Sequence, residues 1–157
     1  LTISGGLAYT DAQVERFRLP PGGNPLDVVP EGTPLAFAPK WKGSLSADYR
    51  HRGLGDLDLW LGGSVSSQSE QIAQFSPNPV VRQLSTIDGY SLVNLSAGIS
   101  DDEDRWRLTF QVRNLFDQSF ASAIQSGGPA GSYRYQISRD ADRYFGLTGR
   151  VNFGGGR

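Results

Sequence analysis

The feature that most constrains this chain is a regular alternation of apolar and polar side chains. In the stretch WRLTFQVR the apolar residues are Trp106, Leu108, Phe110 and Val112, and the polar residues between them are Arg107, Thr109, Gln111 and Arg113. Successive side chains of a β-strand point to opposite faces of the sheet, whereas a helix repeats about every 3.6 residues. The spacing therefore predicts a strand with one apolar face and one polar face.

Five further segments repeat this alternation. Their apolar sets are Ile3, Leu7 and Tyr9; Trp41, Leu45, Ala47 and Tyr49; Leu57, Leu59, Leu61 and Val65; Val93, Leu95, Ala97 and Ile99; and Phe145, Leu147, Gly149, Val151 and Phe153. No segment carries a convincing helical period. We therefore expect an all-β chain of about six strands.

The predicted strands are about ten or eleven residues long, above the usual five or six of soluble sheets. With a tilt near 45°, such a strand covers roughly the 25 Å apolar band of an outer-membrane barrel. The apolar faces are thin and interrupted by glycine, so they would fill the core of a soluble sandwich poorly. We expect a segment of an antiparallel up-and-down transmembrane β-barrel, incomplete as a barrel, whose lipid-facing residues include Leu108, Phe110, Val112, Val93 and Leu95.

The predicted connections alternate between short and long. The short ones are Arg52 to Asp56 and Asp101 to Arg105, and the long ones are about Asp11 to Pro39, Ser69 to Gly89 and Gln118 to Asp142. Bacterial outer-membrane barrels have short periplasmic turns and long extracellular loops, so the first, third and fifth strands would run outward. Aromatic residues near the strand ends could form interfacial girdles, although aromatics are common in any β-protein.

Composition excludes several classes of protein. The 157 residues carry 15 basic and 16 acidic side chains, without the basic patch that nucleic-acid binding requires. The absence of cysteine excludes a disulfide scaffold and thiolate metal sites. No apolar run approaches the roughly 20 residues of a membrane-spanning helix. The chain lacks methionine and begins at Leu1 inside an alternating segment, so we expect a fragment or processed product of a longer protein.

No catalytic residue, metal ligand or cofactor is expected. His51 is the only histidine, and we interpret it as a surface residue beside a tight turn. The run Asp101–Asp104 could hold calcium, but it lacks EF-hand spacing and reads better as a solvated turn. The stretch SGGPAGS, residues 126–132, lacks the lysine and the following helix of a phosphate-binding loop. We therefore predict a chain that is not an enzyme.

Four motifs remain to be interpreted: GYSLVNLSAGI from Gly89, DDEDRWRLTFQVRNLFDQSFA from Asp101, RYFGLTGRVNF from Arg143 and the upstream APKWKGSLSADYR from Ala38. Together they resemble the C-terminal barrel of a TonB-dependent outer-membrane receptor. The family's penultimate strand commonly ends in Asn-Leu-Phe-Asp followed by an aromatic residue, here Asn114, Leu115, Phe116, Asp117 and Phe120. We interpret this motif as the point where the strand leaves the membrane, with Asn and Asp turning the backbone.

The resemblance implies the fold and function of the longer protein. Such receptors form a barrel of about 22 strands around an N-terminal plug, and they lie in the bacterial outer membrane. Their extracellular loops bind a scarce nutrient, usually a ferric siderophore, haem or cobalamin, and the TonB complex supplies the energy for import through the plug. Six strands are fewer than the smallest closed barrels of about eight. Residues 1–157 are therefore expected to be one segment of barrel wall without the plug, unable to transport alone.

Two groups of residues receive roles on this basis. Tyr133, Arg134, Tyr135 and Arg139 could contact an anionic chelate through stacking and charge-assisted hydrogen bonds; alternatively, Arg139, Asp140, Asp142 and Arg143 pair across the start of the last strand. Phe145, Leu147, Val151 and Phe153 match a terminal signal read by the barrel-assembly machinery through strand addition. Phe153 could equally be a girdle residue, because Gly154 to Arg157 follow it.

Two hypotheses from different classes follow. The first is a wall segment of a receptor for TonB-dependent siderophore uptake, with outer-membrane lipid, the assembly machinery, the TonB complex and a ferric siderophore or similar ligand as partners. The second is a soluble or oligomeric β-sheet binding module without transport activity, in which the apolar faces pack against each other or a partner.

Overall fold

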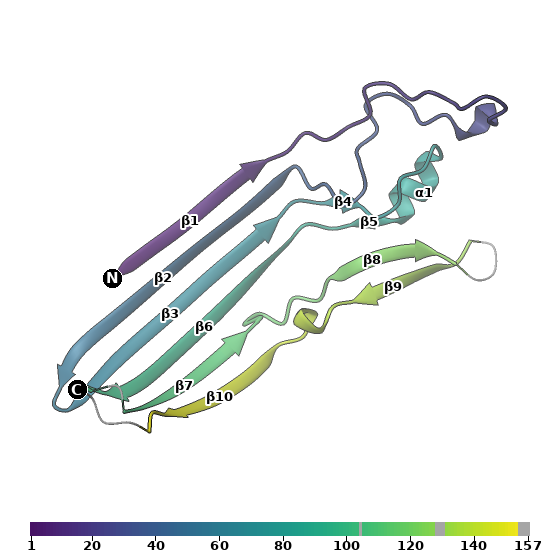
Figure 1. Cartoon of the computed structure of the whole chain (residues 1–157). Helices are drawn as coiled ribbons and strands as arrows, with labels where there is room; N and C mark the ends of the chain where they lie inside the picture. The colour runs from purple at the N-terminus through teal and green to yellow at the C-terminus, as the bar shows by residue number, and fades with distance from the viewer. Residues whose placement is uncertain (104, 128–130, 154–157) are drawn as a thin grey trace.

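A single antiparallel sheet forms most of the molecule. The computed structural model describes the chain except residues 104, 128–130 and 154–157. Its main sheet has six strands in the order β1 (Thr2–Tyr9), β2 (Trp41–Leu54), β3 (Leu57–Gln68), β6 (Tyr90–Asp101), β7 (Trp106–Arg113) and β10 (Tyr144–Val151). Each strand lies beside the next one in this order (Figure 1). The predicted all-β, up-and-down arrangement of six strands is confirmed, and the sheet is open, with β1 and β10 at its edges.

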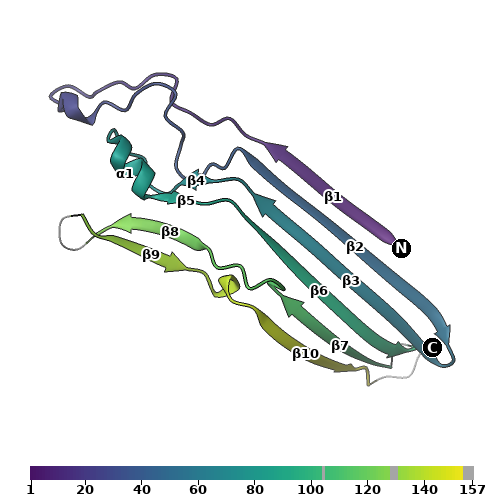
Figure 2. The same ribbon diagram turned by 180° about the vertical axis from the view of Figure 1, so that it is seen from behind.

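The long connections and the short turns lie at opposite ends of this sheet (Figures 1 and 2). The loop end carries η1 (Pro25–Asp27), β4 (Gln71–Ile72), α1 (Pro79–Leu84), β5 (Thr86–Ile87), β8 (Ala121–Ser126), β9 (Tyr133–Ile137) and η2 (Arg139–Ala141). The turn end carries the β2–β3 and β6–β7 connections. The predicted alternation of short and long connections is therefore confirmed.

The short helix α1 was not expected from the sequence. Asn78 caps it, because its Oδ1 atom accepts a hydrogen bond from the Val80 backbone N–H at 2.9 Å, and Pro79 occupies the first turn. A helix of six residues is too short for its period to be recognised against the surrounding loop. Across the part of the chain that the structure describes, no helix is long and apolar enough to cross a membrane.

Cross-strand pairing gathers the apolar side chains on one face, here called the apolar face. One row across the sheet runs through Tyr49, Leu61, Ala97, Phe110 and Leu147. These side chains have little covering them, since Leu61 is 45% exposed and Phe110 is 46% exposed. A contiguous exposed apolar surface of this kind marks contact with a membrane or a partner.

The sheet has almost no buried core of its own. Among the described residues the buried hydrophobic side chains are Val29, Ala73, Ile87, Val112, Ile124 and Ala141. Only Val112 belongs to the six-stranded sheet, where it lies between Leu95 and Phe145 in register. A soluble sandwich would bury the apolar face of such a sheet against a second layer. The described chain provides no such layer.

Candidate functional site

The loops between β3 and β6 and between β7 and β10 pack together at the loop end. Their contact is a cluster of three buried residues, Ala73, Ile87 and Ile124, against which Ala121 and Tyr133 pack. Gln74 adds two polar contacts, because its Nε2 atom donates to the Ile124 carbonyl at 3.2 Å and its Oε1 atom accepts from the Ser126 hydroxyl at 3.1 Å. Two loops distant in sequence therefore form one structure, here called the loop platform, defined as residues 69–89, 118–127 and 131–142.

Asn114 fixes the start of the second loop to its end. Its side chain is buried, and its Nδ2 atom donates to the carbonyls of Gln118 at 3.1 Å and Ala141 at 3.0 Å. The Oδ1 atom of Asn114 accepts from the Gln118 backbone N–H at 2.9 Å. Asn114 has a φ of 49°, in the left-handed region that asparagine tolerates better than most residues. One buried amide therefore satisfies backbone groups at both ends of the loop.

Asp117 completes this arrangement. Its Oδ1 atom accepts from the Arg143 backbone N–H at 2.8 Å, and its own N–H donates to the Asn114 carbonyl at 2.9 Å. The Arg143 guanidinium donates to the Leu115 carbonyl at 3.3 Å. We call Asn114, Asp117 and their backbone partners the loop clasp. The Asn-Leu-Phe-Asp motif thus ends the strand and also joins the two ends of the hairpin loop.

A crevice of about 280 Å³ lies between the two parts of the loop platform. Residues 86–90 form one wall, and residues 118–121 with Ile124, Tyr135 and Ile137 form the other. Tyr90 and Phe120 stack across it with ring centroids 4.0 Å apart and an interplanar angle of 17°. Asp88 is the one charged residue among those that line it.

The four predicted ligand contacts do not lie on one surface. Tyr133 packs against the buried cluster and Tyr135 lines the crevice, and both lie on one face of β9. Arg134 lies between them in sequence and so points to the opposite face. Arg139 is exposed in η2, beyond the end of β9.

The alternative pairing of Arg139, Asp140, Asp142 and Arg143 is not found. Ion pairs of the described residues join Arg50 to Asp58, Arg105 to Asp101 and Arg105 to Glu103. Arg143 instead contributes to the loop clasp through hydrogen bonds.

An ion pair and a backbone hydrogen bond hold the described part of the acidic turn. The Asp101 carboxylate accepts from the Arg105 guanidinium and, at 3.1 Å, from the Trp106 backbone N–H. This bond to Asp101, with the nearby charge of Glu103, raises the pKa of Arg105 above its ordinary value. In the part of the chain that the structure describes, no group of three or more acidic, histidine or cysteine side chains could hold a metal ion. Asp104 lies outside the described residues.

His51 belongs to an aromatic pair, not to a constellation of polar groups. Its ring stacks near Tyr49, with centroids 6.4 Å apart, and its Nδ1 atom lies 3.4 Å from the Tyr49 hydroxyl. At the other end of β2, Tyr9 and Trp41 are cross-strand neighbours with centroids 4.6 Å apart. Trp41 and His51 are ten residue steps apart, about 33 Å along the strand and about 23 Å across a membrane at a tilt near 45°. This separation suits two interfacial girdles.

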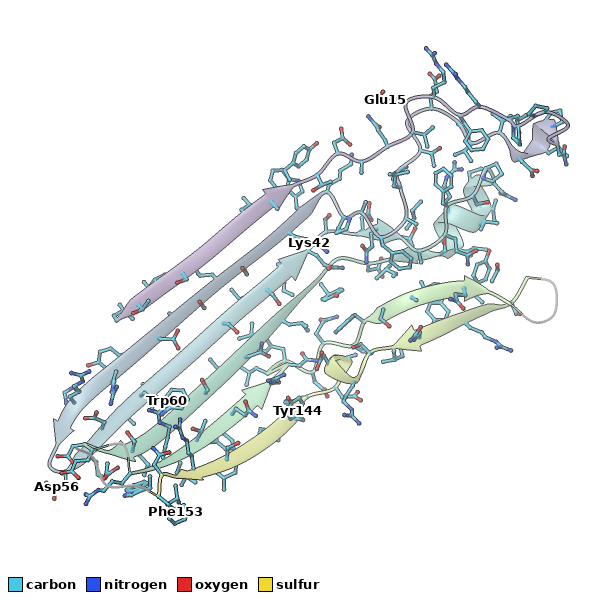
Figure 3. The ribbon with its side chains drawn as sticks, in the orientation of Figure 1. Glu15, Lys42, Asp56, Trp60, Tyr144 and Phe153 are labelled. Carbon is cyan, nitrogen blue, oxygen red and sulfur yellow. The ribbon has the colours of Figure 1, made fainter. Side chains whose placement is uncertain are left out.

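The face opposite the apolar one, here called the polar face, contains a tightly packed tryptophan. Trp60 lies over Gly98, its partner in register, so closely that a Cβ on Gly98 would be 2.2 Å from Trp60 Nε1. Nearby, Asp58 is buried, and its Oδ2 atom accepts hydrogen bonds from Arg50 Nη2 at 2.6 Å and from Arg50 Nε at 3.2 Å. Figure 3 shows Trp60 toward the turn end and Lys42 toward the loop end of the sheet.

The predicted assembly signal lies on and just after the edge strand β10. Phe145, Leu147 and Val151 share the apolar face and are exposed, and Phe153 is 94% exposed (Figure 3). Because β10 is paired only with β7, its other edge is free to receive a strand. Gly154 to Arg157 lie outside the described residues.

The strands of the open sheet are 8 to 14 residues long, and β1, β7 and β10, with 8 residues each, are shorter than the predicted ten or eleven. An open antiparallel sheet with one exposed apolar face, one polar face and its long loops at one end is typical of a segment of an outer-membrane β-barrel. The family model described as TonB dependent receptor-like, beta-barrel matches residues 1–115, which include β1 to β7 and the first two residues of the Asn-Leu-Phe-Asp motif. The chain belongs to this family, whose members are proteins of the outer membrane. No curated protein and no solved structure matches the chain.

Proposed function

We propose that this chain forms one segment of the wall of a receptor that imports a scarce nutrient with TonB-dependent energy, and that the nutrient is a ferric siderophore. The observation that carries the proposal is the division of the molecule into an unpacked apolar face and an ordered loop platform. The apolar face needs lipid, and binding residues concentrate on loops held by a rigid scaffold.

Each predicted group of residues has a role in the proposed receptor. Leu108, Phe110, Val112, Val93 and Leu95 face the membrane, while Phe145, Leu147, Val151 and Phe153 are read by the assembly machinery through the free edge of β10. Tyr133, Arg134, Tyr135 and Arg139 contact the ligand or the loops around it. The plug and the TonB contact belong to other parts of the protein.

The soluble binding module is less well supported. Among the described residues of the six strands, Val112 is the single buried hydrophobic one, which is too little buried apolar area to stabilise a water-soluble domain. Unpaired backbone groups along the edges of β1 and β10 would also promote aggregation in water.

The test is growth on a single iron source. Cells lacking the complete receptor are compared with cells that carry it, in iron-depleted medium supplemented with one purified ferric siderophore at a time. We expect growth on one siderophore class that requires both the receptor and TonB. Receptor-dependent growth on haem and on no siderophore would overturn the siderophore assignment, as would receptor-dependent growth of a cobalamin-requiring strain on cobalamin in a parallel assay. Uptake that is unchanged without TonB would overturn the proposal as a whole.

A further inference from the structure

Among the described residues that line the crevice of the loop platform, Tyr135 is the one predicted contact residue, and most of the other side chains are apolar. Its walls carry three aromatic rings, Tyr90, Phe120 and Tyr135, together with Ile87, Ile124 and Ile137. At about 280 Å³ it is slightly smaller than the usual range for a drug-sized ligand, roughly 300–1,000 Å³. It has room for a ring-bearing part of a ligand rather than for a whole chelate.

The charge on its walls is negative. Asp88 is exposed at the crevice, and no lysine or arginine is among the residues that line it. An aromatic wall also attracts a cation through the negative face of each ring. An anionic group entering this space would lose water and meet a carboxylate, so electrostatics favours a neutral or cationic group.

The position of the crevice connects it to the polar face of the sheet. Tyr90 lines the crevice and also a groove on the polar face with Lys42, Gln68 and Leu92. Phe120, from the other loop, stacks on Tyr90 and so places the crevice directly above the start of β6. Tyr135 is 62% exposed, which leaves its ring free to contact a ligand from outside.

We propose that the crevice between residues 86–90 and the β8–β9 hairpin is a binding subsite for an aromatic group that is neutral or positively charged. The subsite deepens the proposed receptor function, on which it rests, by assigning the ring-bearing part of the ligand to this crevice. Tyr135 provides a stacking surface, and Asp88 favours the cation. Arg134 and Arg139 do not line this space, so an anionic part of the same ligand would bind elsewhere on the loops.

The experiment uses three probes that share one ring and differ in charge: 1-naphthylmethylammonium, 1-naphthalenemethanol and 1-naphthoate. Each is titrated against the complete receptor in outer-membrane vesicles, with saturation-transfer NMR as the readout. We expect the cation to bind more tightly than the alcohol, and the anion to bind about tenfold more weakly than the alcohol. Tyr135→Ala should weaken the two bound probes about fivefold, in the range of one aromatic contact.

Two further variants separate an effect of the Asp88 charge on binding from an effect of substitution on folding. Asp88→Asn should abolish the advantage of the cation over the alcohol and leave the alcohol unchanged. Gln136→Ala is the matched control, because Gln136 lies on the opposite face of β9 and should change nothing. Preferential binding of the anion, or binding that is the same with Tyr135→Ala, would overturn the inference. If no probe binds while the wild-type receptor supports TonB-dependent uptake, only the subsite is refuted. If the wild-type receptor supports no TonB-dependent uptake, the receptor function itself is refuted.

Discussion

The six-stranded sheet of β1, β2, β3, β6, β7 and β10, here called the wall, and the loop platform are stabilised in different ways. The wall is a ladder of backbone hydrogen bonds whose apolar face is left uncovered, with Phe110 and Leu61 about half exposed. The platform has a small buried cluster around Ile124 and a buried polar residue, Asn114, that bonds distant backbone groups. The stability of the wall therefore depends on the solvent that covers its apolar face, whereas the stability of the platform depends on a few specific contacts.

This difference predicts which substitutions each region tolerates. The largest loss of stability is expected from a substitution on the apolar face. Phe110→Arg would place a charge in lipid and should lower the free energy of unfolding of the complete receptor by about 2–4 kcal/mol. Thr109→Arg is the control, because Thr109 is the neighbouring residue on the polar face and should have little effect. Unfolding in urea, followed by heat-modifiable migration on gels, measures both. Equal destabilisation by the two variants would contradict the assignment of the faces.

A smaller effect is expected where Trp60 covers Gly98. Gly98→Ala introduces a methyl group at a position with no room for it, so the tryptophan must move, at a cost of about 1–3 kcal/mol. Gly149→Ala should be nearly neutral, because a Cβ there has no atom within 4 Å. The same unfolding measurement applies to both. An unaffected Gly98→Ala receptor would show that Trp60 does not lie on this glycine.

The loop clasp should respond locally rather than globally. Asn114→Ala leaves the Gln118 and Ala141 backbone groups without their side-chain partner, which costs about 1–3 kcal/mol of local stability. Hydrogen exchange of the backbone amides in β8 and β9 should accelerate, while exchange in β2 and β3 stays unchanged.

Asn114→Asp is the informative control for the clasp. It keeps the acceptor for the Gln118 N–H but places a buried carboxylate oxygen against the carbonyls of Gln118 and Ala141, so its effect should be at least as large as that of Asn114→Ala. Faster exchange throughout the sheet in either variant would mean that Asn114 supports the wall and not the loop.

The smallest effect is expected at the cap of α1. Asn78→Ala removes the hydrogen bond to the Val80 N–H and should destabilise this helix by about 1 kcal/mol. Asn78→Asp keeps the acceptor and should restore most of the loss. Proteolytic cleavage rates within residues 79–84 provide the measurement, and unchanged rates for Asn78→Ala would contradict the capping role.

The regular part of the fold could be predicted from the sequence because its signal is local. Alternation in WRLTFQVR assigns faces to β7 without knowledge of its neighbours, and the turn after Arg52 and the turn at Asp101 are both short and polar. The family resemblance rests on the same local motifs, and the family match confirms it.

The loop platform could not be predicted in the same way, because its contacts join residues far apart in sequence. Asn114 was recognised as a strand end, but its bond to the Ala141 carbonyl depends on how the loop returns. Ile124 and Ile87 meet only because two loops pack together. Residue type alone predicts both Arg134 and Tyr135 as ligand contacts, although strand geometry places their side chains on opposite faces of β9.

The central claim is that the two faces of the sheet lie in different solvents, and cysteine scanning along β7 tests it most directly. These 157 residues contain no cysteine, so single cysteines at positions 107–112 report one site each once any cysteine elsewhere in the receptor has been replaced. In outer membranes containing the complete receptor, we expect a water-soluble, membrane-impermeant thiol reagent to label positions 107, 109 and 111. A lipid-confined quencher should reach a fluorophore at positions 108 and 110. Labelling without alternation, or with the opposite alternation, would contradict the account.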